Sequence, residues 1–303
     1  MIFDSLNLYI LFLVFIVGTC LGSFYNVVIL RTLSGESIVF PPSKCPKCGN
    51  KLKPWHNIPI ISYLFLKGKC AFCKEKISIQ YPIVELLTGL LFSFAYIKFG
   101  FNYVTLFVLF CISCLIIMTV TDLKEKIVEC IYAIIMAVAG LIYAISAGGL
   151  IGLKDSLIGA VLGFLIIEII ARLGYLFKKG RAMGEADSYV ACALGAAVGY
   201  HDILLVLLYS LAASMIFILP RFFYNRYKEN DALTIFYSSL FFMSIALSFY
   251  FPSSYWVLAF LALTGGLMAF TIIKNIKDAV NLNYLPFVPA LSAGFLYYIF
   301  FVL

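Results

Sequence analysis

Four cysteines form two C-x-x-C pairs in a polar, lysine-rich stretch: Cys45 and Cys48 in CPKC, then Cys70 and Cys73 in CAFC. The 21 residues between the pairs exceed by one the usual zinc spacing of about 15–20. Four thiolates would hold Zn²⁺ tetrahedrally and close its coordination shell, so we expect a structural zinc. Gly49 would allow the tight turn that directs backbone N–H groups toward the sulfurs. A redox-active C-x-x-C is the alternative, which two matched pairs disfavour.

Two aspartates are the other residues whose positions suggest chemistry. Asp122 follows an apolar run, in VTDLKEK, and Asp187 precedes one, in MGEADSYV. Two carboxylates that meet on different helices can share a proton, because like charges a few ångströms apart do not both ionise readily. One carboxylate then activates water while the other protonates a leaving amine, which is the chemistry of an aspartic protease.

Simpler interpretations of these acids remain open. Both aspartates could be solvated residues at helix ends, and Asp187 would also complement the dipole of a helix that begins there. Two glutamates compete with them: Glu168 lies deeper in an apolar run, and Glu85 lies near the start of another. Glu85 closely follows the lysine-rich stretch, where it could pair with a lysine.

The elements that position these groups belong to a membrane protein. Hydrophobic residues make up 63% of the sequence and charged residues 12%, against about 45–50% and about 25% in soluble domains. Apolar runs of about 20 residues recur along the chain, each long enough to cross a bilayer. Backbone groups in lipid must pair internally, and the runs are continuous rather than alternating, so they predict helices. The sequence therefore predicts an all-α polytopic membrane protein with about 8–10 transmembrane helices.

The apolar runs and the turn signals between them set the expected spans. We expect a hairpin that turns at Gly199 to Asp202, whose first arm is rich in Ala and Gly and suits close helix packing. The sequence shows no strict internal repeat. The ten expected spans lie at about 9–30, 82–99, 103–121, 127–147, 156–177, 187–198, 203–219, 233–250, 255–273 and 285–302.

The distribution of charge predicts the orientation. Residues 31–81 carry nine Lys/Arg and two Glu, so the positive-inside rule places this segment in the cytoplasm, where reduction disfavours disulfides. The same rule places both aspartates at the cytoplasmic face and both termini outside. The net charge of +7 thus reports topology, and without aromatic–basic interleaving it predicts no nucleic-acid partner.

These elements divide the chain into four parts. Residues 1–30 are the first transmembrane helix, and 31–81 form a small cytoplasmic zinc-binding domain between the first two helices. Residues 82–219 form a membrane core with both aspartates, and 220–303 form C-terminal transmembrane helices.

The order of these features resembles the type IV prepilin peptidase family. The matching stretches are GSFYNVVILR, CPKC, CAFC, YPIVELLTG, Asp122 after a span, G-x-x-D at Gly184–Asp187, and LPFVPALSAGF near the C-terminus. The family's second motif is usually G-x-G-D followed shortly by Lys, whereas Ala186 replaces the second Gly here and no Lys follows. The spans near 233–273 exceed the family's usual eight.

The resemblance implies a bacterial inner-membrane aspartic endopeptidase that cleaves the leader of type IV prepilins or pseudopilins after a Gly, at the cytoplasmic face. It implies Asp122 and Asp187 as the catalytic pair, the four cysteines as zinc ligands, and 82–219 as the peptidase core. The tetracysteine domain accompanies members that also methylate the new N-terminal residue from S-adenosylmethionine. Expected partners are the prepilin and the lipid bilayer. The alternative is a non-enzymatic membrane transporter or assembly scaffold with a zinc-stabilised cytoplasmic loop.

Overall fold

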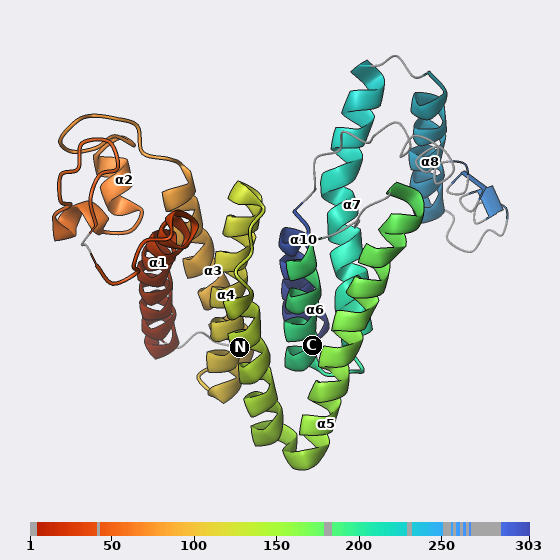
Figure 1. Ribbon diagram of the computed structural model, residues 1–303, viewed down its shortest axis with the longest axis horizontal. Helices are drawn as coiled ribbons and strands as arrows, with labels where there is room; N and C mark the ends of the chain where they lie inside the picture. Colours follow the sequence, from red (N-terminus) through yellow and green to blue (C-terminus); the bar gives the residue numbers. More distant parts are fainter. Residues whose placement is uncertain are drawn as a thin grey trace. The chain divides into compact units, whose positions relative to one another are not determined.

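The described part of the chain is mostly helical, and the loop between α1 (Ser5–Ser34) and α3 (Gln80–Phe99) is its main non-helical segment (Figure 1). Within it there is no β-strand beyond two isolated bridges in the tetracysteine loop, which confirms the all-α prediction. The computed structural model describes residues 5–40, 43–178, 184–228, 232–250, 286–303 and, between 256 and 267, residues 256, 259, 260, 263, 264 and 267.

The chain divides into two compact units. The first consists of residues 1–168, 184–210 and 286–303, and the second of 169–183 and 211–285. Both predicted aspartates and all four cysteines of the two pairs belong to the first unit, so the candidate site can be described within it.

Four long helices of the described chain are apolar and long enough to cross a membrane. They make this chain a multi-pass membrane protein, as predicted. The long helices are α1 (Ser5–Ser34), α3 (Gln80–Phe99), α4 (Tyr103–Glu125) and α5 (Cys130–Lys178). The shorter elements of the first unit are η1 (Pro54–Asn57), α2 (Ile61–Phe65), α6 (Glu185–Val198), α10 (Val288–Tyr297) and η2 (Tyr298–Val302), while α7 (Ile203–Lys228) begins there.

Glycines bring α1 and α3 into close contact. A Cβ on Gly18 would lie 2.8 Å from the Cα of Gly89, and one on Gly22 would lie 2.8 Å from the Cα of Glu85. Small residues spaced four apart let membrane helices approach this closely. The packing fixes the start of α3, and with it Glu85, against the second half of α1.

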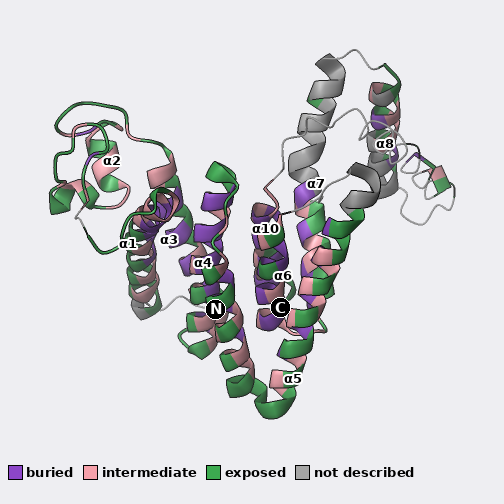
Figure 2. Ribbon diagram, viewed as in Figure 1, coloured by how far each residue is buried: buried purple, intermediate pink, exposed green. Residues whose placement is uncertain are grey.

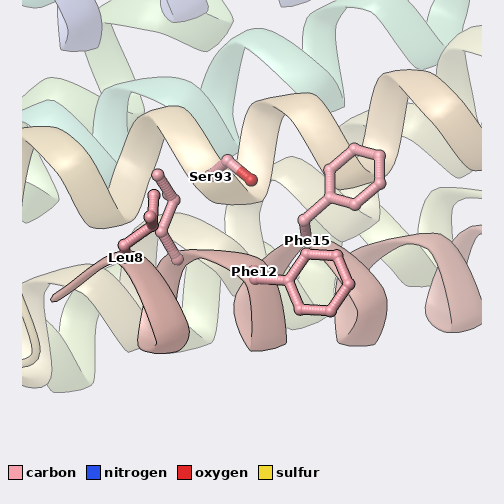
Figure 3. A pocket seen from close by; sticks show the side chains of 5 residues that line it. Leu8, Phe12, Phe15 and Ser93 are labelled. Carbon is pink, nitrogen blue, oxygen red and sulfur yellow. The ribbon is translucent and has the colours of Figure 1, made fainter. Parts of the chain in front are cut away.

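The outer face of this helix pair carries a shallow apolar groove of about 260 Å³ (Figure 3). Its only polar side chain is Ser93, whose hydroxyl donates to the carbonyl of Gly89 at 2.9 Å within the same helix. Phe12 and Leu8 are largely exposed in the groove, as suits a surface that contacts lipid tails. The groove is lined by Leu8, Leu11, Phe12, Phe15 and Ser93.

The two spans predicted within α5 meet at a break. Gly149 has φ +59° and ψ −138°, outside the helical region, and the chain reverses there (Figure 1). The second half of α5 then runs antiparallel to α6: Gly159 packs on Gly195, and Gly163 packs on the backbone of Ala191. The predicted hairpin is confirmed as well, since α6 ends at Val198 and α7 begins at Ile203.

The helix α10 returns the end of the chain to the first unit, where it packs against both α4 and α6. Buried residues are concentrated on these three helices (Figure 2). The predicted last span therefore packs against the two helices that carry the aspartates.

The second unit contains the end of α5, the later part of α7 and α8 (Ala232–Tyr250). The helix α8 coincides with the span expected at 233–250, and its crossing of the membrane stays a prediction. In this unit the hydroxyl groups of Ser244 and Thr264 are hydrogen-bonded at 2.9 Å. The span expected at 255–273 lies mostly outside the described residues.

Candidate functional site

The tetracysteine loop is built from two copies of one small hairpin, offset by 25 residues. In the first copy the amide of Cys45 donates to the carbonyl of Asn50 at 3.0 Å, and in the second the amide of Cys70 donates to that of Glu75 at 2.8 Å. The bridges that close the hairpins pair Lys44 with Lys51 and Lys69 with Lys76. Both copies share the pattern K-C-x-x-C-x-x-K, and the structural repeat was not predicted from it.

Each hairpin turns through a residue with positive φ directly after its second cysteine. Gly49 has φ +71°, as predicted, and the equivalent residue of the second copy is Lys74, with φ +61°. The amides of these residues donate to the carbonyls of Cys45 at 2.9 Å and Cys70 at 3.1 Å. A side chain in this left-handed region costs about 1–2 kcal/mol, so the second hairpin stores strain that the first avoids.

The four sulfur atoms converge. Their Sγ atoms all lie within 4.8 Å of one another, and those of Cys45 and Cys73 are 3.9 Å apart. Tetrahedral coordination with bonds of about 2.3 Å would place sulfurs roughly 3.8 Å apart, so the cluster fits a metal ion held by four thiolates. Backbone amides of Cys73 and Phe72 hydrogen-bond the sulfur of Cys70 and lower its pKa to about 7, whereas the pKa of Cys73 is raised to about 11 beside the other three sulfurs.

Glu85 attaches the tetracysteine loop to α3. Its buried carboxylate accepts a hydrogen bond from the amide of Ile60 at 2.7 Å, and Ser23 of α1 also hydrogen-bonds it. The alternative that Glu85 pairs with a lysine is therefore wrong, because the loop presents a backbone N–H to the carboxylate. Ile60 has φ +60° and ψ −51°, and the amide of Ile61 donates to the carbonyl of Pro59, which is a strained γ-turn.

Asn26 supports the same junction one turn further along α1. It is completely buried, and its Nδ2 donates to the carbonyls of Tyr81 at 3.2 Å and Gly22 at 3.3 Å. Its Oδ1 accepts from Nε2 of Gln80 at 3.3 Å. This role of Asn26 was not predicted, although an amide within an apolar run is a signal for such a role.

Asp122 lies in the last turn of α4, which continues to Glu125 and so extends beyond the span expected to end at 121. Only 1% of Asp122 is exposed, so the alternative of a solvated end residue is wrong. Its Oδ2 accepts a hydrogen bond from the amide of Val288 at 3.1 Å. Val288 is the first residue of α10, so Asp122 caps that helix and complements its dipole.

Asp187 occupies the third position of α6. It is also 1% exposed, and its Oδ2 accepts from the amide of Gly184, the N-cap residue, at 2.9 Å. The expected place at a helix N-terminus is confirmed, and the solvated alternative is again wrong. The neighbouring Ser188, which is buried too, donates to Oε2 of Glu168 at 3.0 Å and ties this first turn to α5.

The two aspartates lie at the same end of the first unit as the tetracysteine loop. The loop leaves α1 at its C-terminal end and enters α3 at its N-terminal end, and α4 then returns antiparallel toward that end (Figure 1). Thr32 of α1 and Tyr132, at the start of α5, are hydrogen-bonded there at 3.4 Å. One turn before Asp122, the hydroxyl groups of Thr119 and Ser292 join α4 to α10 at 2.8 Å.

Two family models match the chain. The Bacterial Peptidase A24 N-terminal domain matches residues 16–99, which contain the tetracysteine loop, and the Type IV leader peptidase family matches residues 109–219, which contain both aspartates. The second match ends well before α10. No solved structure matches the chain.

Similar proteins carry the name prepilin leader peptidase/N-methyltransferase. The one from Myxococcus xanthus is 38% identical over 196 residues, which cover 65% of this chain and 58% of that protein. The one from Neisseria gonorrhoeae is 35% identical over 61% of this chain and 72% of its own, and that from Bacillus subtilis is 34% identical over 66% and 82%. The match thus spans less than two thirds of the Myxococcus protein and more than two thirds of the other two. On these similarities, the chain belongs to the type IV leader peptidase family.

Proposed function

We propose that this chain is a membrane aspartic endopeptidase that cleaves the leader peptide of type IV prepilins or pseudopilins, with Asp122 and Asp187 as its catalytic pair. The observation that carries the proposal is the burial of both aspartates at one end of the first unit. Each accepts a hydrogen bond from a backbone amide at the start of a helix. Ordinary solvated boundary residues would need neither the burial nor these contacts.

The amides orient the two carboxylates. Val288 holds Oδ2 of Asp122, and Gly184 holds Oδ2 of Asp187, so neither side chain rotates without losing a charge-assisted hydrogen bond. In the proposed reaction one carboxylate accepts a proton from a water molecule while the oxygen of that water attacks the scissile carbonyl. The other, protonated, carboxyl delivers a proton to the nitrogen as the C–N bond breaks. No covalent enzyme intermediate forms.

The proposed active site faces the cytoplasm. The nine Lys/Arg of residues 31–81 support this orientation through the positive-inside rule. A prepilin would keep its apolar helix in the bilayer and its basic leader outside the bilayer core. The scissile bond would then lie at the membrane surface, near the depth of the last turn of α4.

A second activity, N-methylation of the new N-terminus, is proposed from the names of the relatives. S-adenosylmethionine would supply the methyl group, as a sulfonium that transfers it to the amine. No set of residues in the described part of the chain is assigned to this donor. We further propose that the four-thiolate site holds Zn²⁺ and stabilises residues 31–81, which are too few to build a core of their own.

The cleavage of a candidate prepilin by the purified, reconstituted protein tests the peptidase, with product masses as the readout. Asp122→Asn and Asp187→Asn should each abolish cleavage while the protein remains in the membrane fraction. Asp155→Asn is the matched control, since Asp155 follows the break of α5 at the opposite end of the unit, and it should cleave normally. Full processing by either active-site variant would exclude this pair, and a wild-type protein that cleaves no prepilin would favour the scaffold alternative.

A further inference from the structure

The tetracysteine loop exposes large apolar side chains on one small helical element. In α2, Ile61, Leu64 and Phe65 share a face by their spacing and are all exposed, Phe65 by 84%. Ser62 and Tyr63, which lie between them, are half-buried, and a Cβ on Gly68 would lie 3.0 Å from the hydroxyl of Tyr63. The apolar stripe of this helix therefore faces away from its own domain.

The stripe continues into a groove. Trp55 of η1 and Ile58, the residue after η1, are exposed and line this groove with Ile61 and Phe65, and its volume is about 330 Å³. We call Trp55, Ile58, Ile61, Leu64 and Phe65 the loop face. Monomeric soluble domains rarely leave such apolar groups clustered in water, so a partner covers them.

Charge indicates what that partner is. Residues 31–81 carry nine Lys/Arg against two Glu, and two of the lysines, Lys53 and Lys67, flank the loop face in sequence. The Nζ of Lys53 lies 5.2 Å from the centroid of the Trp55 ring. Apolar and aromatic groups rimmed by lysines are typical of surfaces that enter the boundary between anionic headgroups and acyl chains.

The attachment of the loop indicates where that partner lies. The amide of Ile60, in the middle of the loop face, is bound to Glu85, which lies five residues into α3. Five residues of helix rise only roughly 8 Å, so Ile60 is held beside the second turn of a membrane-spanning helix. The loop also connects directly to α1 at Ser34 and to α3 at Gln80, so its face stays close to the membrane surface.

We propose that the loop face inserts into the headgroup boundary of the anionic membrane leaflet in which α1 and α3 are embedded. Trp55 and Phe65 anchor the domain among the upper acyl chains, while Lys53 and Lys67 contact lipid phosphates. This holds the tetracysteine domain flat against the membrane beside the ends of the helices that carry Asp122 and Asp187.

Trp55 provides a direct test, because the chain has two tryptophans and Trp256→Phe leaves Trp55 alone. The full-length variant is reconstituted in phosphatidylcholine vesicles with or without phosphatidylglycerol, using lipids brominated near the headgroup or near the chain end. In anionic vesicles, bromine near the headgroup should quench the Trp55 emission strongly, and bromine at the chain end much less. High salt or neutral vesicles should weaken the quenching.

Variants in the same Trp256→Phe background separate the loop face from exposed apolar residues in general. The double variant Leu64→Asn, Phe65→Asn should lose most of the quenching while it retains its metal content, which reports that the domain is folded. Phe101→Asn is the control, because Phe101 is as exposed as Phe65 but lies in the turn between α3 and α4. In this variant the Trp55 emission should be quenched as strongly as without the change.

Other outcomes overturn the proposal. Emission that is solvent-like and unquenched in anionic vesicles excludes membrane contact. Emission that changes with the protein-to-lipid ratio but not with bromine indicates a second copy of the chain, and emission that shifts only when a prepilin is added indicates a peptide partner. Equal quenching in neutral and anionic vesicles excludes the role of the lysines.

Discussion

The amide of Val288 donates a hydrogen bond to the carboxylate of Asp122 at 3.1 Å, across 166 residues of sequence. This contact makes the last helix part of the environment of the first aspartate. The Type IV leader peptidase match ends at residue 219, so the contact lies outside the segment that the family model covers. We expect α10 to be needed for cleavage although it carries no acid of its own.

Val288→Pro tests this contact. Proline is tolerated at the first position of a helix but has no N–H, so the variant should keep α10 and lose the bond to Asp122. A hydrogen bond to a charged group is worth about 1.5–3 kcal/mol, which predicts roughly 10–100-fold slower cleavage at saturating prepilin. Val288→Ala, which keeps the amide and removes side-chain packing, is the control and should be far less affected. Equal losses in the two variants would show that packing, rather than the hydrogen bond, is what matters.

Lys74→Gly should stabilise the tetracysteine domain. Glycine adopts φ +61° without strain, so the change should raise the free energy of unfolding of this domain by about 1 kcal/mol. It also removes the bond from Lys74 Nζ to the carbonyl of Ala71, and Lys74→Ala removes that bond while keeping the Cβ. The measurement is the denaturant concentration at which the purified protein releases its metal to a colorimetric chelator. Lys74→Gly should release its metal at a higher denaturant concentration than Lys74→Ala. Gly49→Ala should release it at a lower concentration than the wild type.

The four-thiolate site should bind a single metal ion per chain. Elemental analysis of protein purified without added metal should find zinc, and Cys45→Ser should lower its content strongly because an S₄ shell loses one ligand. Cys192→Ser, which removes a thiol on α6 outside the cluster, should leave the metal content unchanged. Two disulfides and no metal, seen as a mass decrease of two hydrogen atoms per disulfide and no zinc, would contradict the assignment.

Glu85→Ala should release the loop from α3. The amide of Ile60 then loses a charged acceptor in a buried setting, and the strained γ-turn loses its support. Trypsin should cleave at the loop lysines several-fold faster in Glu85→Ala than in the wild type. Glu85→Gln keeps an acceptor oxygen, so its rate of cleavage should be close to that of the wild type. Glu75→Ala removes an exposed acid from the same loop and serves as the control. Unchanged proteolysis of Glu85→Ala would mean that other contacts hold the loop.

The features that were predictable from the sequence are local ones. A run of about 20 apolar residues is a membrane helix wherever it packs, which is why α1, α3 and α4 were predictable. The turn at Gly199 and the break at Gly149 follow from backbone freedom that only glycine supplies cheaply. The cysteine cluster was predictable because ligand spacing in a short loop constrains which sulfurs can meet.

The remaining features depend on register between distant helices. No local pattern indicates that Asp122 meets Val288, or that Glu85 meets the amide of Ile60 rather than a lysine. A carboxylate near a helix end is compatible with solvent, a lysine or an amide, and the choice depends on how far each helix extends and what packs over its end. The acids could thus be named from the sequence, but their burial and their partners follow from tertiary packing, because a hydrogen bond joins atoms within 3.5 Å whatever their separation along the chain.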